Sequence, residues 1–158
     1  MFQESINNMA TFEIDNSIAD MIKKIDKFAT SEEVYKEMIS AGQKIMKSSI
    51  ESGASKHVET GKMARSLIST EPVKNADGEW VGRVKFSGSD GVHRTKKGKK
   101  YDITNWLKAF RIEYGTSKQK AEPFVRPAIK GCESEINEKW KQIYERKLRE
   151  LQWILMKF

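Results

Sequence analysis

The sequence predicts an α+β fold in which an antiparallel sheet is packed by two N-terminal helices and a long C-terminal helix. Three observations carry this prediction. Apolar residues recur at three- and four-residue steps near both ends of the chain, which is the pattern of amphipathic helices. Residues 80–86 alternate in the period-two manner of a strand, directly after the turn-forming run Asn-Ala-Asp-Gly at 75–78. We expect residues 1–158 to form a single domain.

Two helices are expected over residues 10–52. The first is indicated by an apolar face made of Ile14, Ile18, Met21, Ile22, Ile25 and Phe28. The second begins near Thr30, which stands at capping-box spacing from Glu33, so that each side chain can satisfy the other residue's backbone N–H. It runs to about Ser52, and Gly53 is expected to end it.

The region 58–128 is expected to hold the sheet, with strands between about residues 68 and 114. Residues 60–67 are typical of a capped helical turn, and 68–73 and 80–86 are expected to pair as a β-hairpin. Residues 87–100 contain three glycines and are expected to be a mobile loop. Residues 103–114 fit a short helix that runs into a strand, and the sequence leaves the border between them open.

A long C-terminal helix is expected over residues 127–157. Pro127 suits its first turn, where a missing N–H needs no partner. At ~1.5 Å per residue the helix would span roughly 45 Å, more than one small domain needs to cover itself. We therefore expect its far end to pack on a neighbouring subunit. The apolar residues of that end are Leu151, Trp153, Ile154, Leu155 and Phe158.

Composition excludes several classes of protein. Hydrophobic residues make up 38% of the chain, too many for a disordered segment, and charged residues make up 32%, above the usual ~25%. No apolar run approaches the ~18–20 residues of a membrane-spanning helix, and the N-terminal residues lack the pattern of a secretory signal. The single cysteine, Cys132, cannot form an intrachain disulfide, which indicates a reducing compartment.

No pattern in the sequence indicates catalysis. His57, His93 and Cys132 are not spaced as metal ligands, so we expect no metal centre and no cofactor. Glu113, which precedes Gly115, has two interpretations. It could be a catalytic acid, or it could accept hydrogen bonds from the following loop and pair with Arg126. We favour the structural interpretation because acid–base catalysis needs a second group that the sequence does not offer. The protein is not expected to be an enzyme.

A dense basic cluster lies in the expected loop at 87–100. Its cations are Arg94, Lys96, Lys97, Lys99 and Lys100, and the formal net charge of the whole chain is +7. Such a cluster can neutralise phosphates without reading sequence, and binding of that kind falls steeply with salt. It can equally be a solvated surface loop of a basic protein. Both interpretations stay open.

Three motifs, in fixed order, carry a family resemblance. They are VETGKMARSL at residues 58–67, AFRIEYGT at 109–116 and PFVRPA at 123–128, the last leading into the C-terminal helix. Over roughly residues 30–140 the chain resembles the head–tail joining or tail-completion proteins of the neck of tailed bacteriophages. It departs from their pattern at Glu59, Met63 and Lys108, where the family usually has Asp, Leu and Tyr, and it has a longer insert at 87–100 and an extended last helix.

The resemblance implies a structural role. We expect a virion or tail-like particle protein, made in the host cytoplasm and placed at the neck as a homo-oligomeric ring with a hexamer expected. Its expected partners are further copies of itself, a tail terminator or tail tube protein and a head-side connector protein, with DNA possible in the lumen and no membrane. The alternatives are a sequence-nonspecific nucleic-acid-binding protein, or another neck component such as a tail terminator.

The motif residues have physical roles of their own. Thr60 can cap the turn that follows, Gly61 and Gly115 allow sharp turns, and Thr116 can bond back to its loop. Phe124 is expected to enter the core, and Arg126 is placed for a bidentate bond to Glu113. The full set of predicted motif residues is Thr60, Gly61, Ser66, Glu113, Gly115, Thr116, Pro123, Phe124, Arg126 and Pro127.

Overall fold

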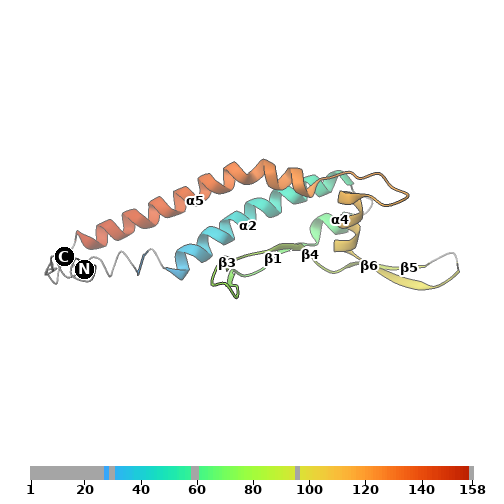
Figure 1. Ribbon diagram of the computed structural model, residues 1–158, viewed down its shortest axis with the longest axis horizontal. Coiled ribbons are helices and arrows are strands. Elements are labelled where there is room, and N and C mark those ends of the chain that lie inside the picture. Colours follow the sequence, from blue (N-terminus) through green and yellow to red (C-terminus); the bar gives the residue numbers. More distant parts are fainter. Residues whose placement is uncertain (1–26, 29–30, 58–60, 95–96, 157–158) are drawn as a thin grey trace, which may run out of the picture.

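The computed structural model describes residues 27–28, 31–57, 61–94 and 97–156 as an elongated molecule of mixed helix and strand (Figure 1). Two long helices run side by side along its length, and short antiparallel strands lie on the side of α2 away from α5. A shorter helix and a projecting hairpin form one end. The elements are α2 (Glu32–Ala54), η1 (Ser55–His57), α3 (Lys62–Arg65), β1 (Leu67–Ser69), β2 (Val73–Lys74), β3 (Trp80–Val81), β4 (Val84–Phe86), β5 (Ser89–Arg94), β6 (Lys100–Thr104), α4 (Asn105–Tyr114) and α5 (Val125–Leu155).

The long helix pair α2–α5 is the spine of the fold. Along the pair, Trp140 of α5 donates its indole N–H to the Met38 carbonyl of α2 at 2.6 Å. Gly42 makes this approach possible, because a Cβ there would lie 3.0 Å from the Trp140 Nε1. Nearer the chain's end, Lys147 bonds to Glu33 at 3.1 Å. The predicted second N-terminal helix and the long C-terminal helix are therefore both present.

The predicted hairpin at 68–86 is confirmed, although it is split into two short ladders. β1 pairs with β4 and β2 pairs with β3, both antiparallel. In the turn, the Asn75 side-chain oxygen accepts the N–H groups of Asp77 and Glu79, and Gly78 has a positive φ of 81°. Gln43 of α2 holds the strands by donating its amide N–H groups to the carbonyls of Thr70 and Arg83.

Within the expected loop at 87–100, Ser89–Arg94 and Lys100 belong to strands instead. β5 and β6 form a third two-stranded antiparallel ladder, with Arg94 opposite Lys100 and an irregularity between Ser89 and Val92. The apolar residues Val92 and Ile103 favour strands on both arms, and Gly98 at φ 76° belongs to the connection. The many lysines of this segment favoured the prediction of a loop over that of two strands.

The expected strand near residue 114 is also wrong. Residues 105–114 form the single helix α4, with the Thr104 side chain accepting the Leu107 N–H at 3.2 Å as its cap. The strands therefore end at Thr104 and form three separate two-stranded sheets instead of one sheet over 68–114. Gly115, at φ 75°, ends the helix.

The start of the C-terminal helix is earlier than predicted. α5 begins at Val125, so Pro127 is its third residue and not its first. Pro127 is still within the first turn, where no backbone N–H has an intrahelical partner, and a proline is tolerated there. The first predicted helix, at 14–28, lies outside the described residues except for Lys27 and Phe28, which are helical.

The core is gathered where the end of α2, α3, α4 and the start of α5 converge. Its buried members are Ile50, Ala54, Met63, Ala64, Leu67, Ala109 and Phe124. Among the described helices, none is long and apolar enough to cross a bilayer.

Candidate functional site

Glu113 is the centre of the motif region. Its side chain comes from the last turn of α4, and the residue is only 3% exposed. One carboxylate oxygen accepts the N–H groups of Phe124 (2.7 Å) and Val125 (2.8 Å), and the other accepts the N–H of Arg126 (3.2 Å). Those donors belong to the start of α5, which has no side-chain cap of its own. Glu113 thus caps α5 from another helix.

Arg126 completes the contact from the outside. Its guanidinium Nε lies 3.0 Å from the same carboxylate, while its side chain is largely exposed. The predicted pair therefore forms through one nitrogen and is not the expected bidentate fork. Burial is the largest effect on the pKa of Glu113 and raises it. The N–H groups of Val125 and Phe124, with Arg126, together outweigh burial, so the pKa is lowered from its ordinary value.

The loop after α4 is built on Gly115 and Thr116. Gly115 lies so close to the returning chain that a Cβ would stand 2.8 Å from both the Ala121 nitrogen and the Gln119 oxygen. Thr116 exchanges backbone hydrogen bonds with Gln119, and its hydroxyl accepts the Lys118 N–H at 3.2 Å. This loop brings residues 122–126 back under the Glu113 carboxylate.

Phe124 enters the core as predicted and is 4% exposed. Its ring lies 6.2 Å from that of Phe86 and 5.3 Å from that of His57. His57, at the end of η1, also places its Nδ1 3.1 Å from a carboxylate oxygen of Glu122. The flanking Pro123 and Pro127 are exposed.

The remaining motif residues shape α3. Gly61 precedes it with a φ of 68°, and the Ser66 hydroxyl donates to the Met63 carbonyl at 2.7 Å. The expected cap, Thr60, lies outside the described residues. The structure therefore places Gly61, Ser66, Glu113, Gly115, Thr116, Pro123, Phe124, Arg126 and Pro127 around one junction between α3, α4 and α5.

The polar groups at this junction are engaged in hydrogen bonds that stabilise the fold. The Glu113 carboxylate is committed to the α5 N-terminus, which favours the structural interpretation of this residue. Cys132 is buried and donates its thiol to the Ile129 carbonyl. Among the described residues, no group of three or more His, Cys, Asp or Glu side chains is arranged to hold a metal ion.

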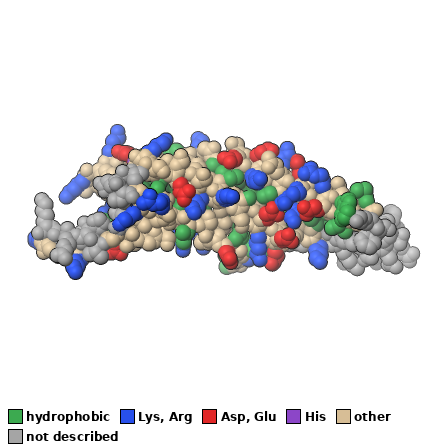
Figure 2. Space-filling view, turned by 180° about the vertical axis from the view of Figure 1, so that it is seen from behind, with side chains coloured by type: hydrophobic (Ala, Val, Ile, Leu, Met, Phe, Trp, Pro, Cys, Tyr) green, Lys and Arg blue, Asp and Glu red, His purple; other side chains and the backbone are tan. Residues whose placement is uncertain are grey.

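The basic cluster lies on the hairpin that projects from one end of the molecule (Figure 1). Arg94 ends β5 and Lys100 begins β6; Lys97, Lys99 and Lys100 are exposed, and Lys96 and the Arg94 side chain lie outside the description. Figure 2 shows more Lys and Arg than Asp and Glu side chains at this end, whereas both kinds are interspersed over the rest of that face.

An exposed aromatic ladder on α4 was missed by the sequence analysis. It consists of Trp106, Phe110 and Tyr114, which are 56%, 45% and 55% exposed. The Trp106 and Phe110 rings stack at 5.4 Å between centroids, and Phe110 and Tyr114 are 4.7 Å apart. The Arg126 guanidinium lies 5.0 Å from the centre of the Tyr114 ring. The i, i+4, i+8 spacing of the three aromatic residues was the available signal in the sequence.

The predicted subunit interface at the end of α5 is partly described. Trp153 and Ile154 are 58% and 45% exposed, and Leu151 is half-buried. The Leu155 side chain and Phe158 lie outside the description. Leu151 and Ile154 line a hollow together with Phe28 and Val34.

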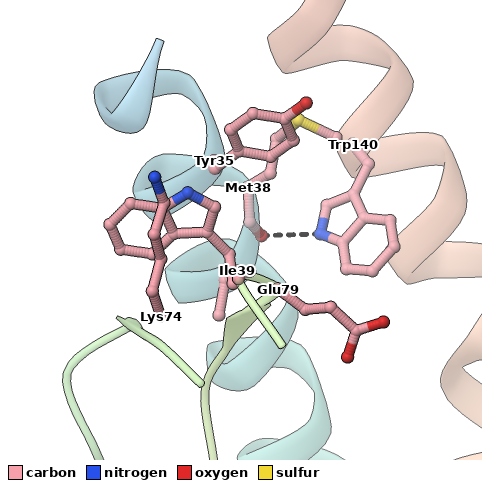
Figure 3. A pocket seen from close by; sticks show the side chains of 8 residues that line it. Tyr35, Met38, Ile39, Lys74, Glu79 and Trp140 are labelled. Carbon is pink, nitrogen blue, oxygen red and sulfur yellow. Dashed lines mark hydrogen bonds between the residues drawn. The ribbon is translucent and has the colours of Figure 1, made fainter. Parts of the chain in front are cut away.

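Two hollows flank the middle of the helix pair and share Ile39, Trp80 and Trp140 as lining residues. Figure 3 shows the first, of about 500 Å³, where Tyr35, Met38 and Ile39 of α2 face Trp140 of α5. The second, which we call the α2–α5 groove, measures about 600 Å³ and lies between α2, α5 and the strand β3. Its lining is mainly apolar, and Glu133 is the one charged side chain among the described residues that line it.

Comparisons of the chain with protein-family models, with curated proteins and with solved structures find no match.

Proposed function

We propose that the protein is a structural subunit of the neck of a tailed phage or tail-like particle, where a ring of copies completes the tail and joins it to the head-side connector. The observation that carries this proposal is the meeting of the three motif segments in one buried cluster. Met63, Ala109 and Phe124 come from the three separate motifs and belong to the same core. The motifs are therefore the signature of a fold, which is what the resemblance implies.

Exposed surfaces outside this buried junction are suited to contacts with other subunits. The α4 ladder exposes three large aromatic side chains side by side, and exposed apolar patches of this kind mark interaction sites. The end of α5 adds Trp153 and Ile154. A head-side connector, a tail tube protein or a tail terminator would each be contacted through such surfaces.

The test is to locate the protein in particles. Particles would be purified from the source strain carrying the tagged protein and imaged by electron microscopy, with copy number taken from quantitative mass spectrometry. The proposal expects label at one end of the tail at a low, fixed copy number. A Glu145→Gln variant, exposed on α5, should be incorporated as wild type, whereas Glu113→Ala should be depleted. Complete particles without label would overturn the proposal.

A second function is favoured by the basic hairpin. Its exposed Lys97, Lys99 and Lys100 could contact the phosphates of DNA in the lumen, or of any nucleic acid if the protein acts alone. Binding of duplex DNA would be titrated against salt, since log K falls by about 0.9 per neutralised phosphate for each tenfold rise in salt. Replacing Arg94, Lys96, Lys97, Lys99 and Lys100 by Gln should flatten that slope. Replacing exposed Lys139 and Lys141 of α5 should change it less.

A further inference from the structure

We propose that the α4 aromatic ladder (Trp106, Phe110 and Tyr114) of one copy docks into the α2–α5 groove of the next copy, with Arg111 beside the ladder facing Glu133 of the groove. The inference rests on the proposed ring, and it names the two surfaces that would join its subunits.

The ladder is built to be an anchor. Trp106 and Phe110 stack with an interplanar angle of 27°, and Phe110 leans on Tyr114 at 38°. Neighbouring rings hold each other in place, so little side-chain freedom remains to be lost on docking. About half of each side chain is nevertheless exposed to solvent. Large aromatic residues at such positions are typical hot spots of protein interfaces.

The groove offers a matching apolar receptor. Its floor includes Ile136, which is 7% exposed, and its walls include Ile39, Met46, Val81, Ile129 and Trp140. Gly42 and Gly82 also line it and add no side chains that would fill it. At Gly82 a Cβ would lie 2.5 Å from the Ile39 Cγ2 and from the Gln43 Nε2. A hollow of about 600 Å³ is consistent with receiving aromatic side chains from outside.

The charges beside the two surfaces are complementary. Arg111 is exposed on α4 directly after Phe110, and Arg126 lies over Tyr114. In contrast, the described residues that line the groove include one charged side chain, the exposed Glu133. The Arg111 cation beside the ladder and the Glu133 carboxylate at the groove have opposite charges, so the contact is favoured in one orientation.

The two surfaces lie on different parts of one chain, since α4 is at the hairpin end (Figure 1), whereas the groove is lined by residues of α2, β3 and α5. A contact between two different surfaces is heterologous. Each copy then keeps one free ladder and one free groove, so the contact continues until the rotation closes a ring. The ladder alone would bury less than the ~800 Å² per partner of a stable interface, so it is the anchor and not the whole contact.

Two variants separate the surfaces. Trp106→Ser with Phe110→Ser removes the ladder, and both residues are too exposed to be essential to the core. Asn137→Arg, on the exposed mouth of the groove, places a long cation there, and Gln142→Arg on the same helix is its matched control outside the groove. Circular dichroism and thermal melting would verify that all variants fold.

Analytical ultracentrifugation then measures self-association. We expect the wild type and Gln142→Arg to form species larger than a monomer, and the ladder and groove variants each to weaken association by about 30-fold or more, the size of a hot-spot truncation. Mixing the two weakened variants should restore a dimer and nothing larger, because one copy retains the groove and the other retains the ladder.

Other outcomes overturn the proposal. The proposal is wrong if the wild type stays monomeric at high micromolar concentration. It is also wrong if Trp153→Ser abolishes self-association while the ladder and groove variants leave it unchanged. Loss in the ladder variant alone would mean that ladders pack on each other. Each of these results leaves the particle-localisation experiment standing, so a failed interface and a failed neck assignment are distinguishable.

Discussion

The carboxylate of Glu113 and the guanidinium of Arg126 meet at 3.0 Å, and the same carboxylate accepts the backbone N–H of Arg126 at 3.2 Å. One side chain on α4 thus fixes both the side chain and the backbone of a residue at the start of α5. Glu113 therefore caps the N-terminus of a helix to which it does not itself belong. This relation joins two of the three motifs at the start of α5, the longest of the described helices.

Removing the Glu113 carboxylate should destabilise the fold. Glu113→Ala leaves the N–H groups of Phe124, Val125 and Arg126 without their acceptor, and each buried donor left unpaired costs about 1–3 kcal/mol, partly relieved where water can enter. We expect a total loss of about 2–4 kcal/mol in the free energy of unfolding, measured by urea denaturation. Glu145→Ala, exposed on α5, is the control and should change stability by less than about 0.5 kcal/mol.

The contribution of Glu113 should vanish in acid. Its pKa in the folded state is lowered, so its stabilising effect is fully present above the ordinary glutamate pKa of about 4.3 and is lost as the pH falls through the folded value. Glu113→Gln keeps the shape and one acceptor but cannot ionise. We expect the stability difference between wild type and Glu113→Gln to be largest at neutral pH and to shrink below about pH 4. A difference that stays constant from pH 7 to pH 3 would contradict this.

Gly115 should be far less tolerant of substitution than Gly78. Both have positive φ, where an alanine costs about 1–2 kcal/mol. At Gly78 a Cβ meets open space, whereas at Gly115 it would stand 2.8 Å from backbone atoms of Gln119 and Ala121. Gly78→Ala should therefore lower the free energy of unfolding by about 1 kcal/mol. Gly115→Ala should add a further 1–3 kcal/mol of the kind that overpacking costs.

Local chemistry made parts of this structure predictable. The Asn75–Gly78 turn follows from residue types at short spacing, and the side-chain chemistry of Phe124, Glu113 and Arg126 predicts a buried ring and an ion pair. Helices α2 and α5 were likewise predictable, because their apolar residues recur with helical periodicity. These features depend on contacts that a few neighbouring side chains determine.

Features that depend on distant partners were not predictable. Residues 112–114 continue α4 and place Glu113 at the α5 N-terminus, a contact between distant residues that leaves no periodic signal. The β5–β6 pairing was hidden by lysines, whose charge indicates exposure and not backbone conformation. The exposure of the aromatic ladder was not predictable, because i, i+4 spacing is the same for a buried stripe and for an exposed one.

Gln43 is a buried polar residue that joins α2 to the strands, and its removal should destabilise the fold. Its amide nitrogen donates to the Thr70 carbonyl at 2.9 Å and to the Arg83 carbonyl at 3.1 Å, across the interface between α2 and the β1–β4 ladder. The residue is 6% exposed. Gln43→Ala leaves both carbonyls without this donor and opens a small cavity, so we expect a loss of about 2–3 kcal/mol in the free energy of unfolding.

The matched control is Gln142→Ala, an exposed glutamine on α5 whose amide reaches Glu138 at 3.5 Å. It should stay within about 0.5 kcal/mol of wild type. Hydrogen exchange adds the spatial test. In Gln43→Ala the Thr70 and Arg83 amides should lose protection, because the backbone bond from Thr70 to the Arg83 carbonyl lies beside the removed amide. Equal loss of protection in the β5–β6 hairpin would instead indicate global destabilisation, and the proposed tie between α2 and these strands would then be wrong.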